Sequence, residues 1–382
     1  MKYRNLSKTG LKVSEVGLGG EYFVKASPEE TQLMIDYAIS QGINIMDVFM
    51  SDPDVRSKIG DALQGQRDKI YVQGHVGAVV EDGQYKRSRD LGQCKEYIAD
   101  FLQRFHTDYI DIAMLHYVDE LADWQKVLDN GILDYMCEQK QKGVFKFLGV
   151  SSHNAKVAQK IVKTGKIDVV MFSINPIFDL VLPSVDTFFG MKDEDPYPTT
   201  MSIDEERVKL YSLCAEMNVA ITVMKSLAAG SLLDASDSPF GKAMTVHQCV
   251  QYALDRPAVA SVLVGCKNLE EVKVFAAFSE HTAAEKDYHD ILAAINTGGR
   301  KTCMYCSHCL PCPMHINIAE VTRLLDAAQN HCITEALKQA YENLEVKPCE
   351  CLACGACVKR CPFGLDVTAN MDAAAKLFEE CC

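Results

Sequence analysis

The chain has 382 residues, of which 48% are apolar, so it is long and apolar enough to bury a large core with a smaller second domain. Its formal net charge of −13 argues against nucleic acid or an anionic membrane surface as a main partner. No apolar run approaches the length of a membrane-spanning helix, and we expect no membrane segment.

The chain starts with Met1–Arg4, and no apolar stretch typical of a secretory signal follows these residues. We therefore expect a cytoplasmic protein. In that reducing location, metal-bound thiolates are more common than disulfides.

Short apolar runs alternate with amphipathic stretches along the first 285 residues. The amphipathic stretches Pro28–Gln41, Leu91–Phe105 and Asp204–Met217 are predicted helices. About eight such βα units predict a (β/α)8 TIM barrel, with a doubly wound open sheet as the alternative. The predicted strands are Val16–Leu18, Ile43–Met46, Ile70–Val72, Tyr109–Leu115, Phe147–Val150, Val169–Ile174, Val219–Met224 and Val259–Val264.

Polar residues follow the predicted strands at their carboxyl ends, where the catalytic residues of such barrels lie. Asp47, His75 and His116 follow three consecutive strands, which indicates a functional cluster. The other polar residues at strand ends are Ser151, Ser152, His153, Asn175, Lys225 and Lys267.

Several of these segments resemble those of aldo-keto reductases, in the same order along the chain. They are Tyr3–Gly20, Gly42–Asp47, Asp108–His116, Gly149–Ser152 and Val262–Val272. The resemblance covers residues 1–285 and implies a barrel of the aldo-keto reductase type with oxidoreductase activity.

The family uses an aspartate, a tyrosine, a lysine and a histidine, with the tyrosine as proton donor to the carbonyl oxygen. By the resemblance, Asp47 matches the aspartate and His116 the histidine. Asp52 stands at the tyrosine position and His75 at the lysine position, so half of the tetrad is replaced. We predict that these four residues form the catalytic site.

Three interpretations of this group stay open. His75 could replace the tyrosine as proton donor, with His116 orienting the substrate. The two histidines and Asp47 could instead bind a catalytic metal ion. In the third interpretation, the polar mouth only stabilises the barrel or binds a ligand.

The resemblance also implies a cofactor site at the barrel mouth. Gly265, Lys267 and Asn268 could bind a phosphate through backbone amides and one positive charge. The family's contacts to adenine fall on Val274 and Phe275, so we expect NADP(H) use to be doubtful, with a flavin also open. The predicted cofactor-binding residues are Ser151, Ser152, Asn175, Lys225, Gly265, Lys267 and Asn268.

Twelve of the 17 cysteines lie in the last 80 residues, and eight of these form two runs with short spacings. Each run ends in Cys-Pro, and the second has the spacing of bacterial ferredoxins. We predict two 4Fe-4S clusters, with paired zinc sites as the alternative. The resemblance to two-cluster ferredoxins assigns Cys303, Cys306, Cys309 and Cys361 to one cluster and Cys351, Cys354, Cys357 and Cys312 to the other.

Between the two runs, Ile316–Asn330 and Ile333–Leu344 have the apolar periodicity of helices. Residues 301–382 are therefore predicted to form a helical ferredoxin-like domain. Residues 286–300 would link it to the barrel of residues 1–285.

A barrel of this type fused to such a domain is similar to the iron–sulfur subgroup of aldo-keto reductases. It implies an oxidoreductase that acts on a small carbonyl or unsaturated substrate, with electrons relayed by the clusters. A ferredoxin or flavodoxin is then an expected redox partner. The alternative is a non-enzymatic electron carrier whose barrel is a docking platform, and converging His75 and His116 would favour the enzyme.

Overall fold

The computed structural model describes residues 1–81, 84–180, 203–236, 238, 240–292, 303, 309–330, 333, 335–361 and 365–379. The chain divides into two compact units. The last residue of unit 1, Glu285, coincides with the predicted end of the barrel domain. Two segments that the sequence analysis placed in the barrel domain belong to unit 2, together with the C-terminal residues. Unit 1 is Met1–Ile174, Val219–Ser226 and Val259–Glu285, and unit 2 is Asn175–Asn218, Leu227–Ala258 and Lys286–Cys382.

In the described part of unit 1, eight parallel strands close into a barrel, which confirms the predicted fold of the barrel. Each strand overlaps one of the predicted apolar runs. Because all of the strands are parallel, their carboxyl ends meet at one mouth. Around the barrel the strands are β3 (Val16–Gly19), β4 (Ile45–Val48), β5 (Tyr71–Val76), β8 (Ile110–Leu115), β9 (Phe145–Ser152), β10 (Val169–Ser173), β11 (Ala220–Met224) and β12 (Val259–Gly265).

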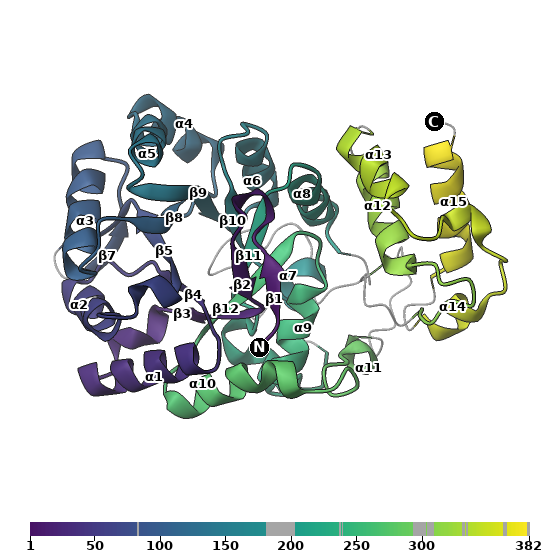
Figure 1. Cartoon of the computed structure of the whole chain (residues 1–382), viewed down its shortest axis with the longest axis horizontal. Coiled ribbons are helices and arrows are strands. Elements are labelled where there is room, and N and C mark those ends of the chain that lie inside the picture. The colour runs from purple at the N-terminus through teal and green to yellow at the C-terminus, as the bar shows by residue number, and fades with distance from the viewer. Residues whose placement is uncertain are drawn as a thin grey trace. The chain divides into compact units, whose positions relative to one another are not determined.

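The helices of unit 1 lie around these strands (Figure 1). The first one shows how the sequence sets a boundary. Ser27 accepts a hydrogen bond from the Glu30 amide, and the Glu30 carboxylate accepts one from the Ser27 amide. The helices are α1 (Pro28–Ser40), α2 (Pro53–Ala62), α3 (Leu91–Arg104), α4 (Leu121–Asp129), α5 (Ile132–Gln141), α6 (Ala155–Val162) and α10 (Leu269–Ala276).

An apolar core fills the barrel. The hairpin of β1 (Tyr3–Asn5) and β2 (Lys12–Ser14) adds Leu6 and Val13 to it, and therefore covers one end of the barrel. Ser14 bonds Asn44 just before β4, so this is the amino end of the strands. The core side chains are Leu6, Val13, Ile45, Ile112, Met114, Val169, Met171, Ala220, Ala260 and Leu263.

A second hairpin, which the sequence analysis did not predict, lies between β5 and α3. It consists of the antiparallel strands β6 (Ala78–Glu81) and β7 (Gln84–Arg87). Gly77 has a φ of +88°, and a Cβ there would lie 2.8 Å from the Ser88 carbonyl oxygen, so the turn requires glycine. Because it follows the carboxyl end of β5, the hairpin lies at the barrel mouth.

Unit 2 is helical in its described residues. Its α12 packs against α8, α13 and α15, and both α12 and α13 lie within the predicted helices. The helices are α7 (Pro176–Leu180), α8 (Glu205–Glu216), α9 (Val246–Leu254), α11 (His289–Leu292), α12 (Ile318–Asn330), α13 (Glu335–Glu342), α14 (Ala356–Arg360) and α15 (Val367–Glu379). Short 3-10 helices in the two units are Ser7–Thr9, Glu21–Val24, Arg67–Lys69, Ala228–Leu233, Ala277–Glu280 and Pro348–Glu350.

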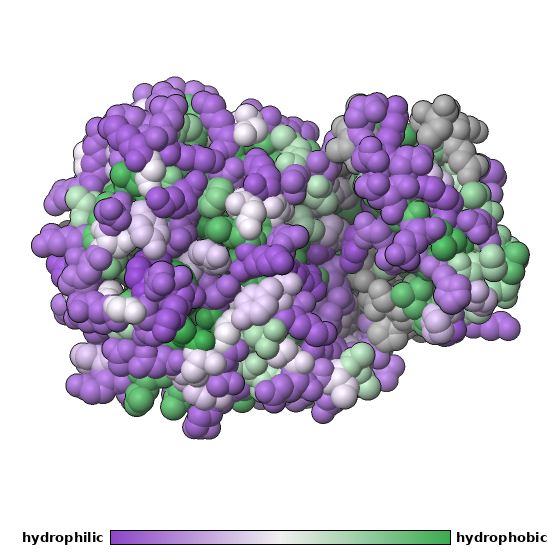
Figure 2. Space-filling model, viewed as in Figure 1, coloured by the Kyte–Doolittle hydropathy of each residue, from purple (hydrophilic) through white to green (hydrophobic). Residues whose placement is uncertain are grey.

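Hydrophilic residues cover most of the face seen in Figure 2. None of the helices in the described residues combines the length and the apolar character that crossing a bilayer requires.

Candidate functional site

Three of the predicted catalytic residues meet at the mouth of the barrel. Asp47 lies on β4, His75 on β5, and His116 directly follows β8. Nε2 of His75 lies 2.9 Å from Oδ1 of Asp47, and Nδ1 of His75 lies 2.8 Å from Nδ1 of His116. All three side chains are buried. They form a continuous hydrogen-bonded chain across three neighbouring strands.

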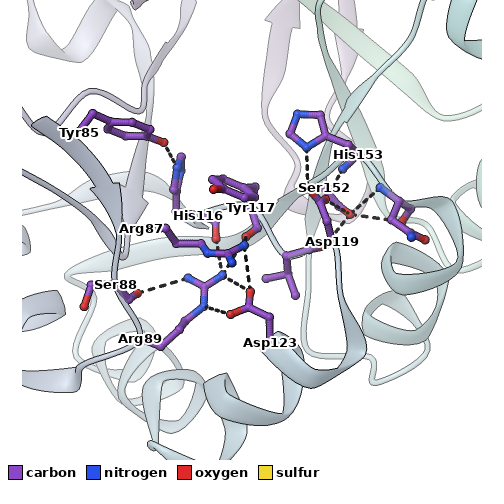
Figure 3. A network of polar contacts seen from close by, with 12 residues as sticks. Tyr85, Arg87, Ser88, Arg89, His116, Tyr117, Asp119, Asp123, Ser152 and His153 are labelled. Atoms are coloured by element: carbon purple, nitrogen blue, oxygen red, sulfur yellow. Dashed lines mark hydrogen bonds and ion pairs between the residues drawn. The ribbon is translucent and has the colours of Figure 1, made fainter. Parts of the chain in front are cut away.

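Tyr85 of the β6–β7 hairpin extends this chain. Its hydroxyl group hydrogen-bonds to Nε2 of His116 (Figure 3). Tyr85 is 39% exposed, whereas His116 is 4% exposed, so the tyrosine is the end of the chain that faces solvent. The sequence analysis missed Tyr85 because it looked for the tyrosine only near position 52. The sequence did contain a signal for the hairpin. Asp82-Gly83 is a dipeptide typical of hairpin turns, and apolar and polar residues alternate on either side of it.

Two arginines, Arg87 at the end of β7 and Arg89 just after it, fasten the hairpin to the segment that follows β8 (Figure 3). Arg89 makes a bidentate ion pair with Asp123, at 3.1 and 2.7 Å, and donates to the His116 carbonyl oxygen at 2.8 Å. The Arg87 guanidinium stacks 4.4 Å from the ring centroid of Tyr117. The hairpin is thereby fastened to the loop that carries His116.

The hydrogen bonds of the chain agree with one proton on each imidazole. His75 then donates to Asp47, His116 donates to His75, and Tyr85 donates to His116. Burial, the neighbouring His75 and the positive charges of Arg89 and Arg87 lower the pKa of His116 well below its usual value. Partial burial is also the main cause that raises the pKa of Tyr85. Both shifts favour a neutral imidazole next to a protonated phenol.

This geometry revises the interpretations of the histidine pair. His75 is 2% exposed and lies behind His116, so it does not face a substrate as a direct proton donor would. Each ring nitrogen of the pair already has a hydrogen-bond partner, which leaves no lone pair directed at a metal ion. Within the described residues, no group of three or more His, Cys, Asp or Glu side chains could hold a single metal ion such as zinc, whose ligands lie closer together than those of a cluster.

Asp52 is not part of the hydrogen-bonded chain that runs from Asp47 to Tyr85. It is the N-cap of α2, where its Oδ1 accepts hydrogen bonds from the amides of Asp54 at 2.9 Å and Val55 at 3.0 Å. The prediction that Asp52 belongs to the catalytic group is therefore corrected. The carboxylate follows the strand because the next helix needs a cap.

The loop after β12 does not fit the phosphate of a cofactor. The Lys267 amide donates to the Glu271 carboxylate at 2.7 Å, and the Asn268 side chain caps α10 by accepting from the Glu271 amide at 3.0 Å. Glu270 adds a second negative charge to this first turn. A Cβ at Gly265 would lie 2.9 Å from the Tyr22 ring, so this glycine serves side-chain packing.

Other predicted cofactor residues make internal contacts. Ser152 is fully buried, and its hydroxyl donates to the Val118 carbonyl oxygen at 2.7 Å. The Ser151 hydroxyl is buried and has no hydrogen-bond partner among the described residues. In unit 2, the Asn175 side chain accepts from the Phe178 amide at the start of α7.

Lys225, at the end of β11, takes part in a second chain of polar contacts in unit 1. Its Nζ lies 3.0 Å from Nε2 of His153, and Nδ1 of His153 lies 2.9 Å from the Asp119 carboxylate. Burial lowers the pKa of Lys225 to about 8, although Asp119 and Glu21 oppose this effect. Burial acts to raise the pKa of Asp119, but its hydrogen bonds and the charge of His153 lower it overall.

In unit 2, four of the predicted cluster cysteines line one cavity. They are the four that the resemblance assigns to one cluster, Cys312, Cys351, Cys354 and Cys357. Arg360 joins the two cysteine segments by donating to the carbonyl oxygens of Cys309 and Pro311, at 2.8 and 2.5 Å. Of the other four predicted ligands, Cys303, Cys309 and Cys361 are described and Cys306 lies outside the described residues.

Comparisons with known proteins identify relatives of the barrel. The model of the Aldo/keto reductase family matches residues 15–249. The uncharacterized oxidoreductase YqkF of Bacillus subtilis is 27% identical over 296 residues, which are 72% of this chain and 89% of the relative. L-galactose dehydrogenase of Arabidopsis thaliana is 24% identical over 290 residues, 72% of this chain and 86% of the relative.

A solved structure shows the same fold. The holo form of aldo-keto reductase AKR11C1 from Bacillus halodurans superimposes with a TM-score of 0.61 at 22% identity. The match covers 78% of this chain and 97% of that protein. It includes nearly the whole length of the solved reductase.

Proposed function

This chain belongs to the aldo/keto reductase family, and we propose that it interconverts a carbonyl group and an alcohol in a small organic substrate at the barrel mouth. It is an oxidoreductase of the aldo-keto reductase type. The observation that carries the proposed reaction is the buried chain from Asp47 through His75 and His116 to the hydroxyl of Tyr85.

In this proposal Tyr85 exchanges a proton with the substrate oxygen. Reduction of a carbonyl adds two electrons and two protons, and the phenol gives the proton that goes to the oxygen. When an alcohol is oxidised, Tyr85 takes the hydroxyl proton while its own proton moves to His116. In alcohol oxidation, one proton moves toward Asp47 in each hydrogen bond of the chain. In carbonyl reduction, one proton moves away from Asp47 in each of them, so the same hydrogen-bonded chain serves both reactions.

The polar barrel mouth supports an enzyme over a non-enzymatic electron carrier. A docking platform gains nothing from four hydrogen-bonded titratable side chains, because burying such groups costs free energy. Three of the four are at most 4% exposed, and they end in a hydroxyl group that faces solvent. This arrangement suits proton transfer to a bound substrate.

The experiment replaces the proposed acid. Tyr85→Phe should lower kcat for an aldehyde substrate by about 10²–10⁴-fold, because the ring stays while the proton donor is lost. Turnover is measured with NADPH and with dithionite-reduced methyl viologen as alternative donors. The matched control is Tyr3→Phe at the far end of the barrel, where the hydroxyl bonds Gly42. Wild-type turnover by Tyr85→Phe would refute the assignment.

We also propose that the cysteines of unit 2 hold two 4Fe-4S clusters. Cys312, Cys351, Cys354 and Cys357 would hold one, and their shared cavity supports the assignment. Cys303, Cys306, Cys309 and Cys361 would hold the other. Bound clusters supply one-electron transfer, which would make a ferredoxin- or flavodoxin-type protein the redox partner. The poor fit of the β12 loop to a phosphate supports this source of electrons over NADP(H).

Anaerobic purification tests the clusters separately from catalysis. We expect about eight iron atoms per chain and absorbance near 400 nm. Replacing both Cys354 and Cys357 by serine should remove about half of the iron. Cys349→Ser is the matched control and should leave the iron content unchanged, because Cys349 is exposed and does not line the cavity. Stoichiometric zinc without iron would refute the clusters.

A further inference from the structure

Lys225, His153 and Asp119 form a proton-accepting relay. Asp119 holds His153 from two sides, because its Oδ2 lies 2.9 Å from Nδ1 and its Oδ1 accepts from the His153 amide at 2.6 Å. The carboxylate favours a proton on Nδ1, which leaves the lone pair of Nε2 directed at Lys225. At 3.0 Å, Nε2 can accept a proton from the Lys225 ammonium group.

The surroundings of Lys225 increase the fraction of its amine that is uncharged. The side chain is partly buried, and its pKa of about 8 lies well below that of an exposed lysine. The carboxylates that act on it are Asp119, which faces it through His153, and Glu21. Lys225 also has a φ of +60°, a conformation that is uncommon for a residue with a side chain and that concentrates at functional sites.

We propose that Lys225 is a nucleophile that forms a Schiff base with aldehydes and ketones, using His153 as its base. This activity is distinct from the proposed redox reaction, in which Tyr85 exchanges a proton with the substrate. The uncharged amine nitrogen attacks the carbonyl carbon, a C–N bond forms as the carbonyl π bond breaks, and His153 carries one of the two nitrogen protons to the oxygen to give a carbinolamine. His153 then accepts the second nitrogen proton and passes it to the carbinolamine hydroxyl, which departs as water and leaves a C=N bond. No oxidant or reductant is consumed.

The position of Tyr117 connects this relay with the first one. Its ring lies 4.9 Å from the ring of His116 and 6.0 Å from that of His153, between centroids. Figure 3 shows His116 and His153 on either side of Tyr117. Both relays therefore open at the same mouth, and the substrate class that suits both is a small aldehyde or ketone.

Reductive trapping tests the proposal. The full-length protein is incubated with propanal and cyanoborohydride at about pH 7, and lysine alkylation is followed by peptide mass spectrometry. Lys225 should be alkylated about tenfold faster than exposed lysines, because a larger fraction of it is uncharged. The reference within the same sample is Lys142, whose side chain is 58% exposed and paired with Glu138.

Variants test whether His153 causes the fast alkylation of Lys225. His153→Gln should reduce the rate at Lys225 to that of Lys142, while Lys142→Arg should leave the rate at Lys225 unchanged. Tyr85→Phe should also retain fast trapping, which separates this proposal from the proposed redox function. Equal rates at Lys225 and Lys142 in the wild-type protein would overturn the proposal, and this comparison does not depend on whether any variant folds.

Discussion

His116 lies in an environment that differs strongly from water. It is buried at the end of β8, between His75 and Tyr85, and two arginines lie nearby. These surroundings disfavour its charged form. A buried histidine that stays neutral makes the stability of the protein depend on pH in a defined direction.

The free energy of unfolding should fall as the pH is lowered below the usual pKa of histidine. The native pKa of His116 is lowered, so below about pH 6.5 the unfolded chain binds a proton that the native chain does not. Above that pH, the burial of neutral His116 leaves the free energy of unfolding unchanged by pH. Below it, the free energy of unfolding falls by about 1.4 kcal/mol per pH unit. Urea unfolding between about pH 7.5 and 5.5 measures this loss.

The variant His116→Gln should be less stable than the wild type near neutral pH, yet should show a shallower fall on acidification. The exposed histidine at position 106, whose side chain is 49% exposed, supplies the control His106→Gln. That variant should keep the wild-type slope. An unchanged slope in His116→Gln would contradict the assignment of the pH dependence to His116.

At the scale of elements, the β6–β7 hairpin determines where Tyr85 lies. It has no place in the repeating βα pattern, and its position depends on the contacts of Arg87 and Arg89 with the loop after β8. A proton donor on such an element is only as well placed as the element itself.

Removing the Arg89 side chain should therefore impair catalysis without removing any group of the relay. We expect Arg89→Ala to lower kcat by about 10–100-fold, because Tyr85 is no longer held against His116. Steady-state kinetics measures the loss, and the pH profile should keep the wild-type form. Arg104→Ala, in a partly exposed pair with Asp100 on α3, is the control and should leave kcat unchanged.

In unit 2, Asp179 connects three helices. This fully buried carboxylate on α7 accepts from Arg207 at 2.7 Å and Tyr211 at 2.6 Å on α8, and from Tyr252 at 2.8 Å on α9. The three donors compensate the cost of burying its charge.

Asp179→Ala should destabilise the protein by about 3–5 kcal/mol, because it leaves the Arg207 guanidinium buried without its carboxylate. Chemical denaturation measures the effect. The corresponding change at Asp372, which is 65% exposed and pairs with Lys376 on α15, should cost less than about 0.5 kcal/mol. Equal losses in the two variants would show that the buried cluster adds no stability.

For the whole molecule, the division into units does not follow the chain order. Residues 175–218 and 227–258 belong to the same unit as the C-terminal segment, and α8 packs against α12. Buried residues lie on most sides of α8, from Arg207 to Cys214, so this helix requires a partner beyond one face. Within unit 2, a helix of the C-terminal segment therefore packs against a helix from the region predicted as barrel.

A chain shortened to residues 1–285 should lose stability and bind a hydrophobic dye. It lacks α12, so apolar side chains of α8 become exposed to water. Equal dye binding by the full chain and the 1–285 chain would contradict this prediction.

The sequence by itself determined the elements and the order of the barrel. Strand and helix periodicity is a local property, so each barrel strand overlaps a predicted run, and α1 begins at Pro28, where the helix was predicted to begin. Asp47, His75 and His116 were found because the parallel topology places every strand end at one mouth.

Only the tertiary structure decided how those residues are used. Tyr85 reaches His116 from an irregular hairpin, Asp52 caps a helix, and Lys225 meets His153 across 72 residues of chain. Periodicity carries no information on such contacts, because they depend on loop paths and side-chain directions that are fixed by packing between distant segments. The sequence therefore located the mouth of the barrel, and the fold selected which side chains contact one another there.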